Sequence, residues 1–132
     1  MQRRTNIKKQ KGFTLVELLV VISIISLLAA VAIPRFVDST ANARTAKLQT
    51  DLISLDSAMR IYATNNNGIT PPYTKVALGP YLSGGELPTA PEGNYKLDGT
   101  IIYSAAPIYS INGDGQASVN IAGTDYTIAT LK

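Results

Sequence analysis

The sequence predicts an α+β fold in which one long N-terminal helix, with a membrane half and an amphipathic half, packs on a small antiparallel sheet. Three observations support this prediction. An apolar run extends from Phe13 to Ile33, an amphipathic helical pattern follows it, and residues 94–131 alternate short β-rich segments with turn residues. At 132 residues, the chain has room for one compact domain beside the apolar run.

A basic leader, residues 1–12, precedes the apolar run. Five of the 12 Lys and Arg residues lie in it, and the rest of the chain has two more acidic than basic side chains, so the net charge of +3 belongs to the leader. As a helix, residues 13–33 would span about 31 Å, roughly the hydrocarbon thickness of a bilayer. Because basic residues keep their end of a span in the cytoplasm, the chain from Arg35 onward is expected outside the inner membrane.

Two other interpretations of this segment stay open. A secretory signal peptide also starts with basic residues and an apolar core, but that core runs only about 7–15 residues before a small-residue cleavage site. The run here is longer and ends at Pro34, although Ala30-Val31-Ala32 resembles such a site. A membrane anchor that is never cut is the other alternative.

The helix is predicted to continue beyond Pro34 to about Asn65. Proline removes one backbone hydrogen bond, so we expect a bend or a locally melted turn between Val31 and Phe36. The sequence Asn65-Asn66-Asn67-Gly68 then ends the helix, since Asn and Gly tolerate the left-handed conformation of a C-cap.

The second half of this helix has an apolar face that we expect to lie against the sheet. Its members follow steps of three, four or seven residues: Val37, Ala41, Leu48, Leu52, Leu55, Met59 and Tyr62. Charged residues flank that face, and Asp56 with Arg60 forms an i,i+4 pair. These charges are interpreted as a solvated or subunit-facing surface.

Residues 67–93 are rich in Pro and Gly and are predicted to form a loop, with a short helical turn near residues 75–82. In the predicted sheet, Asp98-Gly99 suits a type I′ hairpin turn between two strands. Further strands are expected at residues 108–111, 117–121 and 126–130, separated by turns at residues 112–115 and 123–125.

The motif KGFTLVE, the apolar stretch after it and Pro34 together resemble the type IV pilin and pseudopilin superfamily. The resemblance implies the pilin fold, cleavage after Gly12 by a prepilin peptidase and N-methylation of Phe13, with Pro34 at the first helix kink. It divides the chain into a leader (1–12), a transmembrane and polymerisation helix (13–34) and a globular head (35–132). The head comprises an amphipathic helix (35–66), an αβ-loop (67–93) and an antiparallel sheet (94–131).

The resemblance also implies a function. The chain would be a structural subunit of a type IV pilus-like filament or a type II secretion pseudopilus, polymerised through its N-terminal helix by a separate assembly platform and ATPase. It would dwell first in the inner membrane, with the head outside the cytoplasm, and then in a periplasmic or cell-surface filament. Because a carboxylate inside an apolar helix costs about 2.5–3.5 kcal/mol, Glu17 needs a partner. The freed amine of Phe13, on the same or a neighbouring subunit, would supply it.

Catalysis is not expected, because the chain contains neither cysteine nor histidine. Thiol nucleophiles, Cys/His zinc sites and a Ser-His-Asp relay are therefore excluded. Major pseudopilins of type II secretion use calcium, which makes Asp114 in the loop 112–116, with Asp125, a candidate site; an ordinary hairpin turn is the alternative. Calcium takes six to eight oxygens. The chain also lacks the Trp-Gly element that major pseudopilins tend to carry before the sheet.

A competence-type pilin that binds DNA for uptake is the alternative function. It would require one exposed stripe formed by the dispersed basic residues Arg35, Arg44, Lys47, Arg60, Lys75 and Lys96. The acidic excess of the mature chain argues against nucleic acid as a partner. An anchored hydrolase would require a catalytic constellation that the sequence does not contain.

Overall fold

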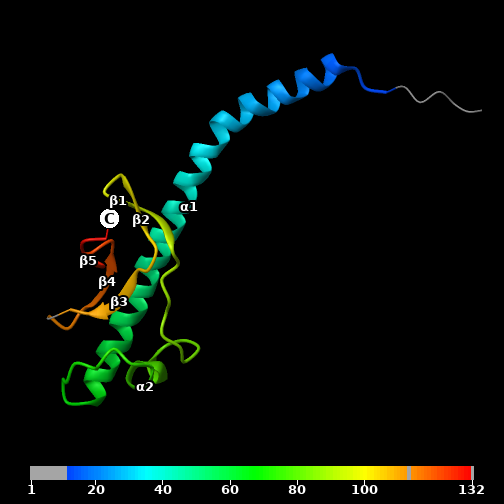
Figure 1. Cartoon of the computed structure of the whole chain (residues 1–132). Coiled ribbons are helices and arrows are strands. Elements are labelled where there is room, and N and C mark those ends of the chain that lie inside the picture. Colours follow the sequence, from blue (N-terminus) through cyan, green and yellow to red (C-terminus); the bar gives the residue numbers. More distant parts are fainter. Residues whose placement is uncertain (1–11, 113, 132) are drawn as a thin grey trace, which may run out of the picture. The chain divides into compact units, whose positions relative to one another are not determined.

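The computed structural model describes residues 12–112 and 114–131 (Figure 1). The chain divides into two compact units, Met1–Arg35 and Phe36–Lys132. The first contains, in its described part, residues 12–14 and the start of helix α1 (Leu15–Asn65). The second contains the rest of α1 and all five strands, so the predicted α+β fold with a long N-terminal helix is confirmed.

Helix α1 ends as the sequence predicts. Asn67 and Gly68 both have positive φ angles, 55° and 83°. The Gly68 N–H donates to the Ala63 carbonyl at 2.8 Å, the hydrogen bond of a Schellman motif. A left-handed Asn followed by Gly therefore stops the helix after Asn65.

The loop after α1 contains one short helical segment, where the sequence predicts it. Helix α2 (Lys75–Leu78) begins with Thr74 as its N-cap, whose hydroxyl accepts a hydrogen bond from the Ala77 N–H at 3.2 Å. A 3-10 helix, η1 (Gly79–Tyr81), continues it. A Cβ on Gly79 would lie 2.9 Å from the Gly85 carbonyl oxygen, so glycine permits the close approach of these two loop segments.

The first two strands, β1 (Gly93–Leu97) and β2 (Thr100–Ser104), form an antiparallel hairpin. Asp98 and Gly99 connect them with φ angles of 48° and 77°, which confirms the predicted turn. Strands β3 (Ile108–Ile111), β4 (Ala117–Ile121) and β5 (Thr124–Thr127) form a second antiparallel sheet in the order β3-β4-β5.

Two details differ from the prediction. The strands form two sheets rather than one. The last strand occupies Thr124–Thr127 and not residues 126–130, because the turn before it falls at Ala122 and Gly123, whose φ angles are 51° and 89°. Alanine is not a turn signal, so sequence inspection placed this turn too late.

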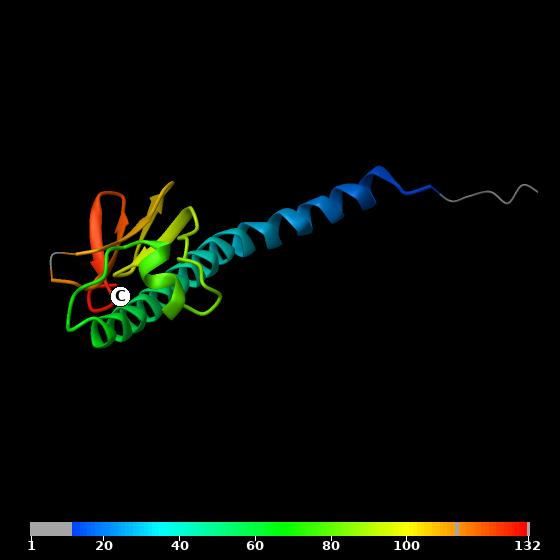
Figure 2. The ribbon, with the colours of Figure 1, turned by 90° about the horizontal axis from the view of Figure 1, so that it is seen from below.

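The hydrophobic core lies between α1 and the two sheets, all within the second unit. Figures 1 and 2 show both sheets on one side of the C-terminal half of α1. The predicted helix face is buried at Ala41, Leu48, Leu52, Leu55 and Met59. The sheets and loops contribute the buried side chains of Leu78, Tyr95, Leu97, Tyr109, Ala117, Val119, Ile121 and Leu131.

Polar side chains of α1 also form hydrogen bonds with the backbone of the strands and of the C-terminal segment. The Thr45 hydroxyl donates to the Lys96 carbonyl and accepts from the Lys96 N–H, both at 3.0 Å, and holds β1. The Asp56 carboxylate accepts from the backbone N–H of Ala117 on β4 at 2.9 Å. Gln49 donates to the carbonyl of Leu131 at 3.1 Å.

Asp51 supplies another such contact. Its carboxylate accepts hydrogen bonds from the Tyr109 hydroxyl on β3 at 2.6 Å and from the Lys47 ammonium at 2.5 Å. The interpretation of Asp51 and Asp56 as solvated or subunit-facing charges is therefore wrong. Among the described residues no salt bridge joins Asp56 to Arg60, because the carboxylate of Asp56 is directed at β4 instead.

Candidate processing and assembly site

The predicted cleavage junction lies immediately before α1. Gly12, Phe13 and Thr14 are not helical and all three are exposed, with 89% of Phe13 accessible. A Cβ built on Gly12 would meet no atom within 4 Å. The described part of the chain thus leaves the Gly12–Phe13 peptide bond open to a second protein.

Thr14 and Glu17 form a capping box at the start of the helix. The Glu17 N–H donates to the Thr14 hydroxyl at 3.2 Å. In return, Glu17 Oε2 accepts from both the N–H and the hydroxyl of Thr14, each at 2.8 Å. Two backbone N–H groups that would have no helical partner are satisfied reciprocally.

Thr14 is a residue that the sequence interpretation missed. The pattern Thr-x-x-Glu before an apolar run is a known N-terminal signature of helices, and it could have been found at this point. Glu17 therefore contributes locally through defined hydrogen bonds as well as through the helix dipole. Its second oxygen, Oε1, accepts no hydrogen bond from residues that the structure describes.

The apolar segment, residues 15–33, is uncovered. All of its side chains are exposed except the half-buried Ala29. Its most apolar 18-residue window has a mean hydropathy of 2.8, and none of it is buried, so this is a helix long and apolar enough to cross a membrane. The hydroxyls of Ser23 and Ser26 donate to the carbonyls four residues earlier, at 2.8 Å, and so need no partner outside the helix.

Pro34 lies inside α1, and the helix is continuous through residues 31–36. The sequence predicted either a bend or a locally melted turn at Pro34. The structure of the single chain contains no melted turn there. A helix can accommodate proline when neighbouring groups compensate for the lost hydrogen bond.

The candidate calcium residues do not come together. Asp114 lies in the turn before β4, whereas Asp125 pairs with Asn120 near the opposite end of that strand. The two are thus separated by about 10 Å of strand, and ligands of one calcium ion must each lie about 2.3–2.6 Å from it. Asn112 Oδ1 already accepts from the N–H groups of Asp114 and Gln116, as in an ordinary turn. Residue 113 lies outside the described residues.

Four of the six basic residues proposed for DNA binding each lie beside a different neighbour in the structure. Lys47 pairs with Asp51, Lys75 with Glu86, and Lys96 with Asp38 at 3.8 Å. The guanidinium of Arg44 lies over Gly93, where an added Cβ would be 2.8 Å from its central carbon. The described side chains therefore do not present these cations as one free stripe.

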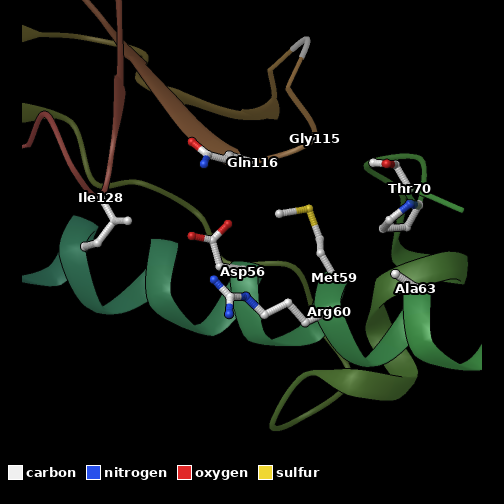
Figure 3. A pocket seen from close by; sticks show the side chains of 9 residues that line it. Asp56, Met59, Arg60, Ala63, Thr70, Gly115, Gln116 and Ile128 are labelled. Atoms are coloured by element: carbon white, nitrogen blue, oxygen red, sulfur yellow. The ribbon is translucent and has the colours of Figure 1, made fainter. Parts of the chain in front are cut away.

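A pocket of about 310 Å³ lies between α1, the loop at Thr70 and Pro71, and the turn before β4 (Figure 3). Asp56 and Arg60 project from α1 beside Met59, with Gln116 on the opposite wall. These side chains include no nucleophile paired with a base. The pocket consequently has the composition of a surface recess rather than of a catalytic site.

A long uncovered apolar helix with a capping carboxylate at its start, joined to a small α+β head, is the architecture of a membrane-anchored subunit. The prokaryotic N-terminal methylation motif matches residues 7–33. Type II secretion system core protein G of Aeromonas hydrophila is 31% identical over 140 residues, which cover 95% of this chain and 92% of the relative. The chain therefore belongs to the type IV pilin and pseudopilin superfamily.

Other relatives agree with this assignment. Type II secretion system core protein G of Klebsiella michiganensis is 29% identical over 133 residues, covering 89% of this chain and 90% of the relative. A fimbrial protein of Pseudomonas aeruginosa is 45% identical, but only over 51 residues, 39% of this chain and 33% of the relative. No solved structure is significantly similar. Pilin-like structural subunits form homopolymeric filaments, and the matched motif indicates membrane anchoring before assembly.

Proposed function

We propose that this chain is the subunit of a type II secretion pseudopilus or a related type IV pilus-like filament. The observation that carries the proposal is the uncovered apolar helix, with Glu17 as its one charged residue and an open junction three residues before the helix start. Similarity over nearly the whole chain to core protein G of type II secretion, against 51 residues for the fimbrial protein, favours the secretion pseudopilus.

In this mechanism the chain enters the inner membrane as a precursor, and a prepilin peptidase cuts after Gly12 and methylates the amine of Phe13. An assembly platform and ATPase then move the subunit into a filament in the periplasm or at the cell surface. The chain itself performs no catalysis. Calcium at Asp114 or Asp125 is no part of this proposal, since the turn geometry provides no shared ligand set.

Glu17 has two roles in the proposed mechanism. In the single chain it closes the capping box with Thr14, which leaves Oε1 available. Once cleavage frees the amine of Phe13, a cation lies one residue before Thr14, within reach of a carboxylate of the same or an adjacent subunit. An unpaired charge in an apolar filament core would cost several kcal/mol, so pairing selects subunits that are inserted in the correct register.

The test compares Glu17→Val with wild type in cells that contain no other copy. We expect normal membrane insertion and cleavage after Gly12, verified by the intact mass of the membrane-derived protein, but little or no sheared filament. Glu17→Asp, shorter by one methylene, should be intermediate. Thr14→Ala is the matched control for the capping box, because it removes the cap and leaves the carboxylate in place.

Wild-type filament yield from Glu17→Val would refute the pairing mechanism. A mature species that retains residues 1–12, or one cut near Ala32, would refute the processing step. If Thr14→Ala lowered filament yield as much as Glu17→Val, helix capping rather than charge pairing would explain the effect.

A further inference from the structure

The turn between β3 and β4, residues 112–116, is ordered by Asn112. The side-chain oxygen Oδ1 of this residue accepts from the N–H groups of Asp114 and Gln116, at 3.1 and 2.9 Å. Its backbone closes the same turn, because its N–H donates to the Gln116 carbonyl at 2.9 Å and its carbonyl accepts from the Gly115 N–H at 3.0 Å. Asn112 therefore takes part in each hydrogen bond that joins the described residues of this turn to one another.

Two neighbours outside this turn fix its position in the head. Asp56 on α1 accepts from the Ala117 N–H at 2.9 Å, where β4 begins. The turn also approaches the loop after α1, since a Cβ added to Gly115 would lie 3.2 Å from Thr70 Oγ1 (Figure 3). Gly115 has a φ of 73°, so glycine suits both the backbone conformation and the close approach. Protein groups thus hold the turn from within and from two sides.

The turn between β4 and β5 is closed in a similar way by Asn120. Its Oδ1 accepts from the Gly123 N–H at 3.1 Å, and its Nδ2 donates to Asp125 Oδ1 at 2.8 Å. Ala122 and Gly123 both have the positive φ angles of a tight hairpin turn, 51° and 89°. The carboxylate of Asp125 therefore already accepts a hydrogen bond within its own turn.

These are the two turns that carry the candidate calcium ligands. Calcium takes about six to eight oxygens, whereas each turn contributes one carboxylate, Asp114 or Asp125, and the two lie near opposite ends of β4. Among the residues that the structure describes, no three acidic side chains gather closely enough to hold a metal ion. An asparagine whose side chain accepts backbone N–H groups can order a turn without an ion, as in an Asx turn.

We propose that Asn112 orders the β3–β4 turn in place of a metal ion, so that the head folds and is equally stable with and without calcium. Asn120 does the same for the β4–β5 turn. The inference goes beyond the proposed function, because it concerns the folding of the head and holds for any filament that the chain builds. It distinguishes this chain from calcium-dependent major pseudopilins and leaves it in the same superfamily.

The test is thermal unfolding of the full chain in detergent, in CaCl2 or in the chelator EGTA, followed by near-UV circular dichroism. All seven tyrosines lie in the second unit, so this signal reports the head. We expect the Tm of wild type to agree within about 1 °C in the two conditions, since the inference assigns calcium no part in the folded head. Calcium at about 10 mM, roughly 10–100 times the Kd of extracellular calcium modules, would raise the Tm of a calcium-held head by about 5 °C or more. MgCl2 at the same concentration is the control for ionic strength.

Variants of the turn test the role of Asn112 directly. Asn112→Ala should lower the Tm by about 4–8 °C, equally in CaCl2 and in EGTA, because two backbone N–H groups lose their acceptor. Asn112→Asp keeps an acceptor oxygen in place and should stay within about 2 °C of wild type in EGTA, which decides the question even if Asn112→Ala does not fold. Gln116→Ala is the matched control in the same turn and should also stay within about 2 °C, because its side chain is exposed.

A wild-type Tm higher by about 5 °C or more in CaCl2 than in both EGTA and MgCl2 would overturn the inference. Asp114→Asn, which removes the candidate carboxylate, should unfold at the same Tm as wild type in CaCl2, and a decrease confined to CaCl2 would also overturn it. An Asn112→Ala protein as stable as wild type would refute the role of Asn112. The experiment needs no filament, so its outcome is independent of the proposed assembly and of charge pairing at Glu17.

Discussion

Asp56 illustrates at the residue scale how a tertiary contact changes the role of a charge. Its neighbour one turn later on α1 is Arg60, and Figure 3 shows both projecting from the same stretch of helix. The carboxylate nevertheless accepts a hydrogen bond from the Ala117 N–H at 2.9 Å, where β4 begins. A backbone donor at a strand end is thereby satisfied, whereas an exposed i,i+4 ion pair would be worth only about 0.2–0.5 kcal/mol.

Asp56→Ala should therefore destabilise the head by about 1–3 kcal/mol, because the N–H of Ala117 loses its partner. Arg60→Ala is the matched control and should cost no more than about 0.5 kcal/mol. Urea unfolding of a head fragment that starts at Val37 would measure both. Equal small losses for the two variants would contradict this role of Asp56 and restore the interpretation as a solvated ion pair.

At the scale of elements, α1 and the sheets are joined by apolar packing and by a few polar contacts at defined positions. The contact between Asp51 on α1 and Tyr109 on β3 is one of these: the hydroxyl donates at 2.6 Å and Tyr109 is only 5% exposed. Burial, and then the hydrogen bond to Asp51, raise the pKa of Tyr109 well above its ordinary value. Burial also raises the pKa of Tyr73 and Tyr95.

These shifts predict a loss of stability at alkaline pH. Because the pKa of each tyrosine is raised in the folded state, its neutral form contributes fully to the free energy of unfolding below the ordinary tyrosine pKa of 10.0. This stabilisation is lost as the pH rises above that value, because only the unfolded chain then ionises. The free energy of unfolding should fall by up to about 1.4 kcal/mol per pH unit for each such tyrosine.

Urea midpoints of the head fragment at pH 8 to 11 would measure this dependence. Tyr109→Phe should be less stable than wild type at pH 8 and should show a shallower decline above pH 10. The exposed Tyr103, replaced by Phe, is the control and should leave the slope unchanged. A decline with the same slope in Tyr109→Phe and in wild type would show that Tyr109 is not the titrating group.

At the scale of the whole molecule, the chain consists of two units with opposite requirements. In the second unit, apolar side chains from α1 and both sheets are buried together. In the first, the apolar side chains of α1 are exposed and require lipid or neighbouring subunits. One continuous helix belongs to both units, which suits a subunit that passes from a membrane into a polymer.

A fragment that starts at Val37 should consequently be soluble, monomeric and cooperatively folded, since every buried residue of the core lies after it. The full mature chain should require detergent or lipid. Analytical ultracentrifugation and near-UV circular dichroism of both proteins would check this. A molten fragment would mean that the placement of Leu48, Leu52 and Leu55 against the sheets does not stabilise the head without residues 13–36.

The sequence by itself determined the features that depend on neighbouring residues. The apolar run with its one charged residue, the end of α1 after Asn65 and the Asp98-Gly99 turn follow from hydropathy and from backbone conformations that few residue types adopt. The capping box of Thr14 and Glu17 is equally local, and its signal was present in the sequence. Such features are predictable because their energies come from groups a few residues apart.

Only the tertiary structure decided which distant groups meet. The partners in the contact of Asp56 with Ala117 lie 61 positions apart, and those of Thr45 with Lys96 lie 51 apart. The division into two sheets and the turn at Ala122 likewise depend on how the strands pack on α1. Many partners could satisfy a lone carboxylate or hydroxyl, and the choice among them is made when apolar burial brings α1 and the strands together.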